Sequence, residues 1–363
     1  MAQQKISERL RTSLVIVRTQ PSLGVKIWQY LNGGNWFTVY LFIFLFFAFT
    51  WSAANSGTPL ELRVLNTFAA AAMLLMGGCV YFWTANRPRT EKLVYDLISV
   101  AETLEALSTV KQTRRMYKAS KKTKVFVQMF YLVVFGAQVV YISFPLISGT
   151  NMGNIPTVDS YTFGFWITYV LVTYCFVTGT AVSSFLSYNA QMCLCLVSLL
   201  QTLKEQIRDV QVDGALVCLI TIHQDLLKVA INFRNLCLRA FFVLMSSFTI
   251  LLIANTSILI TLSKDPGIMV MVAQNMGIIY CLCAFGEQIQ RFSAEISEGA
   301  YEGAWIYQSL SFRRSVMFVI ARCQTPCYLK AALIGKLEFR LFMTAIKLWY
   351  RFVQALLNLT ARN

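Results

Sequence analysis

The chain has 363 residues, of which 56% are hydrophobic, 14% aromatic and only 13% charged. Soluble domains carry about 25% charged residues, so this composition excludes an ordinary soluble protein and indicates a polytopic membrane protein. The formal net charge of +15 would suggest a nucleic-acid partner on a soluble protein. Here the basic residues are distributed as membrane topology requires, and no nucleic-acid partner is expected.

The N-terminal stretch 1–35 is expected to be a cytoplasmic arm. It contains no continuous apolar core followed by a small-residue cleavage site, so an internal helix should drive membrane insertion. Its basic residues are Lys5, Arg9, Arg11, Arg18 and Lys26.

Seven segments are apolar enough and long enough to cross a bilayer as helices, which takes about 20 residues each. We predict an all-α membrane protein with spans at 36–54, 62–84, 125–147, Thr162 to beyond Tyr188, 240–262, 267–286 and 336–360.

The loops between these spans predict the orientation of the chain. Loop 85–124 contains ten Lys or Arg against four acidic residues, whereas loop 145–161 contains no basic residue and one acid, Asp159. Because short basic loops stay in the cytoplasm, the N-terminus should be cytoplasmic and the C-terminus extracellular. This is opposite to a G-protein-coupled receptor, and the D-R-Y and N-P-x-x-Y motifs of that family are absent.

Helical periodicity continues beyond the spans on the cytoplasmic side. Leu93, Leu97, Leu104 and Leu107 should share one helical face. Apolar periodicity also continues over 190–210, breaks at Asp213-Gly214 and resumes from residue 215, and 287–333 contains shorter helical apolar stretches. We expect a cytoplasmic helical platform that serves as a subunit interface. The alternative is that these helices are adsorbed on anionic lipid.

Sites for covalent or metal chemistry are not expected. The pairs Cys193-x-Cys195, Cys281-x-Cys283 and Cys323-x3-Cys327 lack zinc-ligand spacing with a nearby His, and His223 is the single histidine. We interpret the cysteines as small core residues, and predict no enzymatic activity, no metal and no cofactor.

The last span carries an unusual polar stripe. At about 100° per residue, seven polar residues fall within a sector of about 80°. They are Lys336, Arg340, Thr344, Lys347, Arg351, Gln354 and Asn358. Since buried cations are costly in hydrocarbon, the stripe should face water or a protein partner. It could flank a lumen or contact a neighbouring subunit; the remaining alternative is a packed helix with no pore role.

The C-terminal third, "YEGAWIYQSLSFRRSVMFVIARCQTPCYLKA" followed by "GKLEFRLFMTAIKLWYRFVQALL", resembles the insect odorant receptor family. The order and spacing of a set of residues carry the resemblance: Tyr301, Trp305, Arg313, Arg314, Gln324, Pro326, Ala331, Phe342, Tyr350 and Phe352. The length and predicted spans also agree. The chain looks like an odorant-tuning subunit and not the shared co-receptor, which has a large insertion before its fifth span.

This resemblance implies a ligand-gated, non-selective cation channel in which four subunits, including co-receptor subunits, surround one pore. The implied divisions are the arm 1–35, helices 1–6 with their extensions over 36–300, an anchor half of helix 7 over 301–333 and a pore-lining half over 334–363. The two half-helices should cover roughly 304–327 and 336–360. The implied pore residues are Leu348, Phe352, Ala355 and Leu359, flanked by Lys347, Arg351, Gln354 and Asn358.

The resemblance also implies an odorant pocket in the outer half of the bundle, for a small volatile organic ligand in contact with apolar and aromatic side chains. The candidates are Phe68, Ala72, Val134, Ala137, Gln138, Tyr141, Phe165, Tyr169, Thr173, Gln274 and Ile278. Ordinary helix packing is the alternative explanation for each.

Two other functional classes remain open on the residues alone. One is a seven-span chemoreceptor that signals through a cytoplasmic transducer without its own pore, and the other is a membrane enzyme or transporter. The orientation and the basic last helix argue against the first, and the lack of internal repeats or paired acids within spans argues against the second. The resemblance implies the plasma membrane of olfactory sensory neurons as the location, with membrane lipid as a further partner.

Overall fold

The computed structural model describes residues 60–148, 163–261 and 266–360, together with a few helical positions between 39 and 54. The N-terminal arm 1–35, most of the predicted first span 36–54, and most of the outer loop 145–161 therefore lie outside the described residues. So do residues 262–265 and the last three residues.

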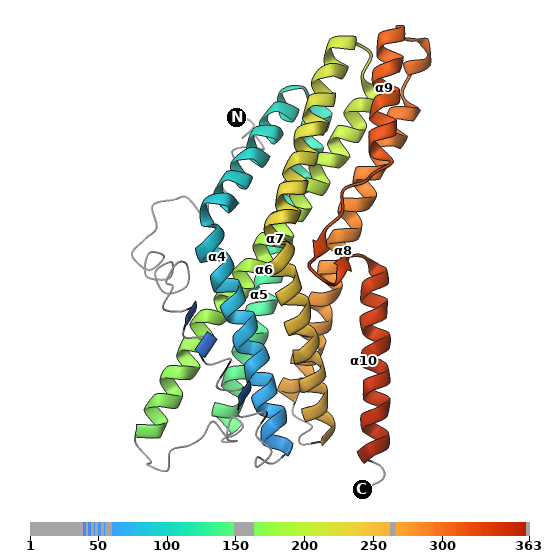
Figure 1. The fold of residues 1–363 in the computed structure, drawn as a ribbon. Coiled ribbons are helices and arrows are strands. Elements are labelled where there is room, and N and C mark those ends of the chain that lie inside the picture. The colour runs from blue at the N-terminus through green and yellow to red at the C-terminus, as the bar shows by residue number, and fades with distance from the viewer. Residues whose placement is uncertain are drawn as a thin grey trace.

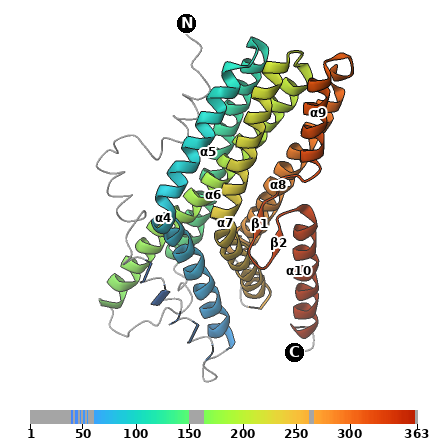
Figure 2. The same cartoon turned by 45° about the horizontal axis from the view of Figure 1, so that its top comes forward.

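Five long helices run alongside one another and form the body of the molecule (Figures 1 and 2). They are α4 (Leu60–Ala106), α5 (Val110–Ser148), α6 (Phe163–Asp209), α7 (Asp213–Thr261) and α8 (Pro266–Glu302). The prediction of an all-α membrane fold is confirmed for the described residues, apart from one two-stranded hairpin.

These helices are much longer than a bilayer requires. They contain 37 to 49 residues, and at 1.5 Å per residue they extend about 55–75 Å, roughly twice the hydrocarbon thickness. Each of the five predicted spans on these helices therefore continues without a break into a helical extension beyond the length that a bilayer requires. In the described residues, three helices meet the length and hydropathy expected of a span: Val182–Asp209, Asp213–Thr261 and Gly267–Glu302.

The turns after α4, α6 and α8 gather at one end of the molecule, the upper end in Figure 1. Gln206 Nε2 donates to Ser108 Oγ at 2.6 Å, which joins α6 to the turn after α4. Ser309 Oγ donates to Asp213 Oδ2 at 2.9 Å, and Arg115 forms a 2.7 Å salt bridge with Glu205. These contacts assemble the helical platform that the sequence predicted; its cytoplasmic location stays a prediction.

The apolar face predicted for 93–107 is present, with one correction. Leu93, Leu97 and Leu104 are buried in the core, but Leu107 is 43% exposed. Helix α4 ends at Ala106, so Leu107 lies in the turn before α5 and no longer follows the helical register.

The C-terminal region is a chain of short elements. A 3-10 turn, η2 (Trp305–Tyr307), leads into α9 (Leu310–Cys323), where Ser309 Oγ caps the helix by accepting from Phe312 N at 3.1 Å. An antiparallel hairpin of β1 (Lys330–Ala331) and β2 (Gly335–Lys336) follows, and then α10 (Phe339–Thr360).

The predicted half-helices 304–327 and 336–360 are therefore longer than the observed helices. The break between them is longer than expected, over residues 324–338, and it contains the hairpin, where Leu333 and Gly335 adopt positive φ angles of 62° and 113° and turn the chain back on itself. The predicted division between residues 333 and 334 falls inside this hairpin.

Candidate functional sites in the bundle and the last helix

Helix α10 stands beside α7 and α8 and contacts them along one face (Figure 2). Leu341, Phe342 and Trp349 pack against the hydrophobic core. The ring of Tyr280 on α8 lies 5.3 Å from that of Phe342, and Trp349 Nε1 donates to Thr256 Oγ1 on α7 at 3.0 Å. These contacts fix the rotation of α10 about its own axis.

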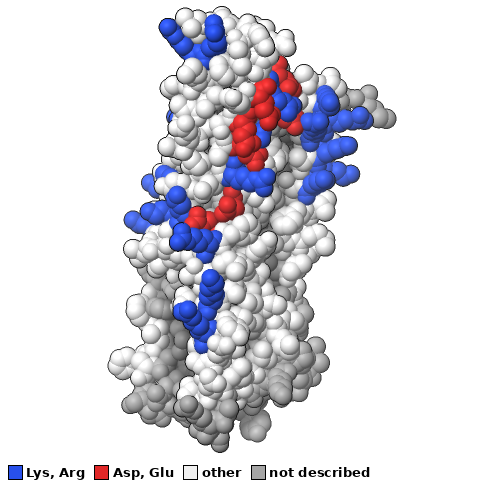
Figure 3. Space-filling view, turned by 90° about the vertical axis from the view of Figure 1, so that its right-hand side faces the viewer, with Lys and Arg blue, Asp and Glu red and all other residues white. Residues whose placement is uncertain are grey.

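The polar stripe lies on the opposite face of α10, apart from Lys336, which was predicted to belong to it but lies in β2, before the helix begins. Lys347, Arg351, Gln354 and Asn358 are all exposed. On a helical wheel the centre of these four residues stands about 150–170° from Phe342 and Trp349. These four residues therefore do not pack against the other helices of the chain. In Figure 3, which shows this side of the molecule, Lys and Arg side chains continue lower on the surface than Asp and Glu do.

The residues predicted to line the pore form a neighbouring face of α10. Leu348 and Leu359 are 60% and 61% exposed, Ala355 is exposed and Phe352 is half-buried. A chain on its own thus leaves both the polar stripe and the apolar pore face uncovered. Their assignment to a pore remains a prediction.

The candidate pocket residues are only partly described. Phe68, Ala72, Val134, Ala137, Gln138, Tyr141, Phe165, Tyr169 and Thr173 lie on helices α4, α5 and α6, and their side chains lie outside the described part of the structure. Gln274 and Ile278 lie one turn apart on α8. Ile278 is 2% exposed and belongs to the core, and Gln274 is half-buried. The pocket therefore also remains a prediction.

The close packing of the hairpin on α7 and α8 was not predicted from the sequence. Ala332 N donates to Leu238 O on α7 at 3.0 Å. A Cβ placed on Gly286 of α8 would overlap the backbone oxygen of Leu337, so only glycine allows this approach. Phe339 N at the start of α10 donates to Glu287 Oε2 at 3.3 Å. Gly286 could have suggested a close approach of the backbone at this point. The sequence does not indicate that the approaching residue is Leu337, 51 residues later.

The cysteines behave as the sequence suggested. Seven of those described are buried without a disulfide: Cys79, Cys193, Cys195, Cys237, Cys283, Cys323 and Cys327. Cys218 is exposed and Cys281 is half-buried. Within the described ranges, no group of three His, Cys, Asp or Glu residues is arranged to hold a metal ion.

His223 lies in the platform extension of α7, 17 residues before the predicted fifth span. It is 2% exposed, and its Nε2 lies 3.9 Å from the Sγ of Cys323 on α9. Burial, with a smaller contribution from the nearby Arg322, lowers the pKa of His223 from 6.5 to about 4. Burial also raises the pKa of the Cys323 thiol to about 11, so both groups are neutral at pH 7. The pair packs α9 against α7 and shows no sign of activated chemistry.

Known proteins resemble this chain in both sequence and fold. "Putative odorant receptor 92a" of Drosophila melanogaster is 29% identical over 82 residues, which is 23% of this chain and 20% of that protein. "Odorant receptor 85c" of the same species is 27% identical over 96 residues, 25% of each chain. These alignments span only about a fifth to a quarter of the length of the curated relatives.

The fold similarity covers nearly the whole chain. The structure of the olfactory receptor OR5 from Machilis hrabei in complex with eugenol superposes with a TM-score of 0.73, and a structure of the same receptor reported without a named ligand gives 0.74. Both cover 98% of this chain and 97% of the receptor at 14% identity, so they establish a shared fold.

The 7tm odorant receptor family model matches residues 61–350, which include helices α4 to α9 and half of α10. This multi-pass membrane protein, which is not an enzyme, therefore belongs to the 7tm odorant receptor family.

Proposed function

We propose that the chain is the odorant-binding, tuning subunit of a ligand-gated, non-selective cation channel. In this proposal it assembles with co-receptor subunits into a heterotetramer around a central pore, in the plasma membrane of olfactory sensory neurons. A small volatile organic ligand binds between the second, third, fourth and sixth spans, and the last helix lines the pore.

The observation that supports assembly into an oligomer is an apolar surface at the platform end of the molecule. The outer surface of η2 and α9 exposes Ile306, Tyr307, Leu310, Met317 and Phe318, with Tyr307 91% exposed. The opposite face of α9 is buried against the bundle through Phe312, Val316, Val319 and Cys323. The buried face of α9 is thus covered within the chain, whereas its outer face leaves large apolar side chains exposed, with Arg314 between Met317 and Phe318.

Lipid tails do not explain this surface. Charged side chains gather over the same end of the molecule (Figure 3), and salt bridges such as Lys204–Glu298 lie there. A region with this many charges belongs outside hydrocarbon. Contiguous exposed apolar side chains in water mark a protein interface, and we assign this one to contacts between subunits.

The exposed faces of α10 support the second part of the proposal. A membrane helix whose outer side bears Lys347 and Arg351 is costly in lipid and stable beside water. A symmetric or pseudo-symmetric tetramer would enclose such water between four α10 helices.

The test is to co-express the chain with an odorant receptor co-receptor and record from excised patches without GTP. Odorant-evoked cation current within milliseconds is expected. A response that requires GTP would instead support signalling through a cytoplasmic transducer and would remove the channel proposal. The proposed topology is tested by a C-terminal epitope tag, which should be stained on intact cells.

Interface variants test the assembly separately. Met317→Glu/Phe318→Glu should abolish co-purification with the co-receptor because two carboxylates would be desolvated at the interface. The melting temperature of the purified chain should not change, since both side chains are exposed in it. Lys330→Glu, at an exposed hairpin position, is the control that should assemble normally.

A further inference from the structure

One face of α5 changes from basic to apolar within a single turn. Its first four turns expose Lys111, Arg114, Arg115, Lys118, Lys121 and Lys122, and the next turns expose Val125, Phe126, Met129, Leu132 and Val133. At about 100° per residue both sets fall within one sector of about 140°. The change occurs between residues 122 and 125, where the predicted third span begins.

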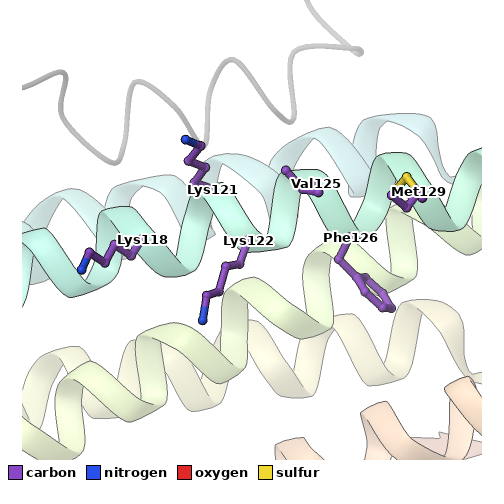
Figure 4. Close-up of a pocket in the computed structure, with 6 residues that line it drawn as sticks. All are labelled: Lys118, Lys121, Lys122, Val125, Phe126 and Met129. Carbon is purple, nitrogen blue, oxygen red and sulfur yellow. The ribbon is translucent and has the colours of Figure 1, made fainter.

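A hollow lies across this boundary (Figure 4). Figure 4 shows the three lysines at one end of it and the ring of Phe126 and the side chain of Met129 at the other. Phe126 is held in place by ring contacts with Phe130 at 6.0 Å and with Phe285 of α8 at 6.4 Å. The hollow is lined by Lys118, Lys121, Lys122, Val125, Phe126 and Met129.

The three lysines are close together and lack an acidic partner. Lys118 lies three and four residues from Lys121 and Lys122, so their Cβ atoms are about 5–6 Å apart on the helix surface. In the described part of the chain none of the three forms a salt bridge, whereas Arg115, one turn earlier, pairs with Glu205. Three exposed cations without a salt bridge beside an apolar wall match an anionic ligand with an apolar part.

We infer that this hollow binds one phosphorylated inositol phospholipid of the inner leaflet. Each phosphomonoester carries a charge of about −1.5 to −2 at pH 7, so one or two of them match three ammonium groups better than a singly charged headgroup does. The acyl chain lies against Val125, Phe126 and Met129. Basic clusters next to a membrane helix on the cytoplasmic side are typical of such lipids, and the loop 85–124 is predicted to be cytoplasmic.

The test measures binding and does not depend on channel activity. The full chain is reconstituted into phosphatidylcholine nanodiscs and titrated with a fluorescent, short-chain phosphatidylinositol 4,5-bisphosphate. Lys118→Gln/Lys121→Gln/Lys122→Gln should weaken binding at least tenfold. The matched control, Lys111→Gln/Arg114→Gln/Lys124→Gln, removes the same three charges from positions outside the hollow and should change the affinity less than twofold. An unchanged melting temperature shows that each variant is folded.

Two competitors identify the source of the phosphate. Free inositol 1,4,5-trisphosphate should compete at least tenfold less well than the lipid, because it has no acyl chain to contact Phe126. Phosphatidylserine should also compete at least tenfold less well. Equal loss in both triple variants would show a diffuse basic surface and overturn the site. Equal competition by the free headgroup or by phosphatidylserine would overturn the proposed occupant.

Discussion

Trp349 of α10 donates a 3.0 Å hydrogen bond from its Nε1 to the Oγ1 of Thr256 on α7, and Thr256 Oγ1 in turn donates to Leu252 O at 2.7 Å. This is a side-chain hydrogen bond between the last helix and the bundle, at a site where both residues are at least partly buried. It fixes the face that α10 turns toward α7, and hence the face on which Lys347 and Arg351 are exposed.

Trp349→Phe should lower the stability of the seated helix by about 0.5–1.5 kcal/mol, the usual net value of one hydrogen bond. Thr256→Val should cost somewhat more because it also removes the bond to Leu252 O. The double variant should be less destabilising than the sum of the two single ones, because both remove the bond between Trp349 and Thr256. The measurement is thermal melting, monitored by chemical labelling of the buried cysteines. Tyr350→Phe, at an exposed neighbour, is the control; fully additive effects would show that the bond does not form.

Two glycines on α8 should respond in opposite directions to alanine. Gly286→Ala places a Cβ against the backbone of Leu337 and should destabilise the protein by about 1–3 kcal/mol, because the hairpin must move away from α8. Gly277→Ala meets nothing within 4 Å and should be neutral or stabilising by up to about 1 kcal/mol. Equal melting temperatures for the two variants would contradict the observed seating of the hairpin.

Stability should depend on pH through His223. Its pKa is lowered from 6.5 to about 4, so between these values the unfolded chain binds a proton that the folded chain excludes. The stabilisation is therefore fully present above pH 6.5 and falls by a few kcal/mol as the pH decreases toward 4. His223→Gln should remove this part of the slope when melting is compared at pH 7 and pH 4.5. Since His223 is the single histidine, any slope left in the variant belongs to carboxylates; parallel slopes would exclude this role.

Neutralising the polar stripe should change conduction if α10 lines the pore. Two like charges about 8 Å apart at an effective dielectric of about 20 repel by about 2 kcal/mol, so four copies of Lys347 and Arg351 around one lumen disfavour cations. The chain alone should conduct poorly, and Lys347→Gln/Arg351→Gln should raise conductance and calcium permeability in channels mixed with the co-receptor.

The control for the stripe is Lys92→Gln/Lys228→Gln, which removes two exposed charges from α4 and α7. If stripe and control variants give the same single-channel conductance and calcium permeability as wild type, the stripe contacts a neighbouring subunit instead of the lumen.

The pocket proposal is tested at two tyrosines. Tyr141→Ala and Tyr169→Ala should each shift the odorant dose-response curve by roughly ten- to a hundredfold, because the loss of an aromatic wall and a hydroxyl costs about 1–3 kcal/mol of binding. Surface expression should be unchanged. Tyr95→Ala, at an exposed position on α4, should leave the curve in place. Unchanged curves for both pocket variants would remove these residues from the site.

The features of this protein that depend on local residue patterns could be predicted from the sequence alone. Apolar periodicity predicted the membrane class and the long helices with platform extensions, and the C-terminal motif with Tyr301 and Trp305 identified the family. These features can be read locally because helix formation and membrane insertion depend on residues within a few turns of one another.

Which face of each helix is covered could not be predicted and became clear from the packing of the helices. The wheel of α10 showed a polar stripe beside an apolar face, but the contact of Trp349 with Thr256, 93 residues away in the chain, determines that the stripe points away from the bundle. The seating of the hairpin on Gly286 and the exposed outer surface of α9 likewise depend on distant residues. Packing between helices joins residues far apart in sequence, and no local periodicity encodes which of two apolar faces a helix buries within its own chain.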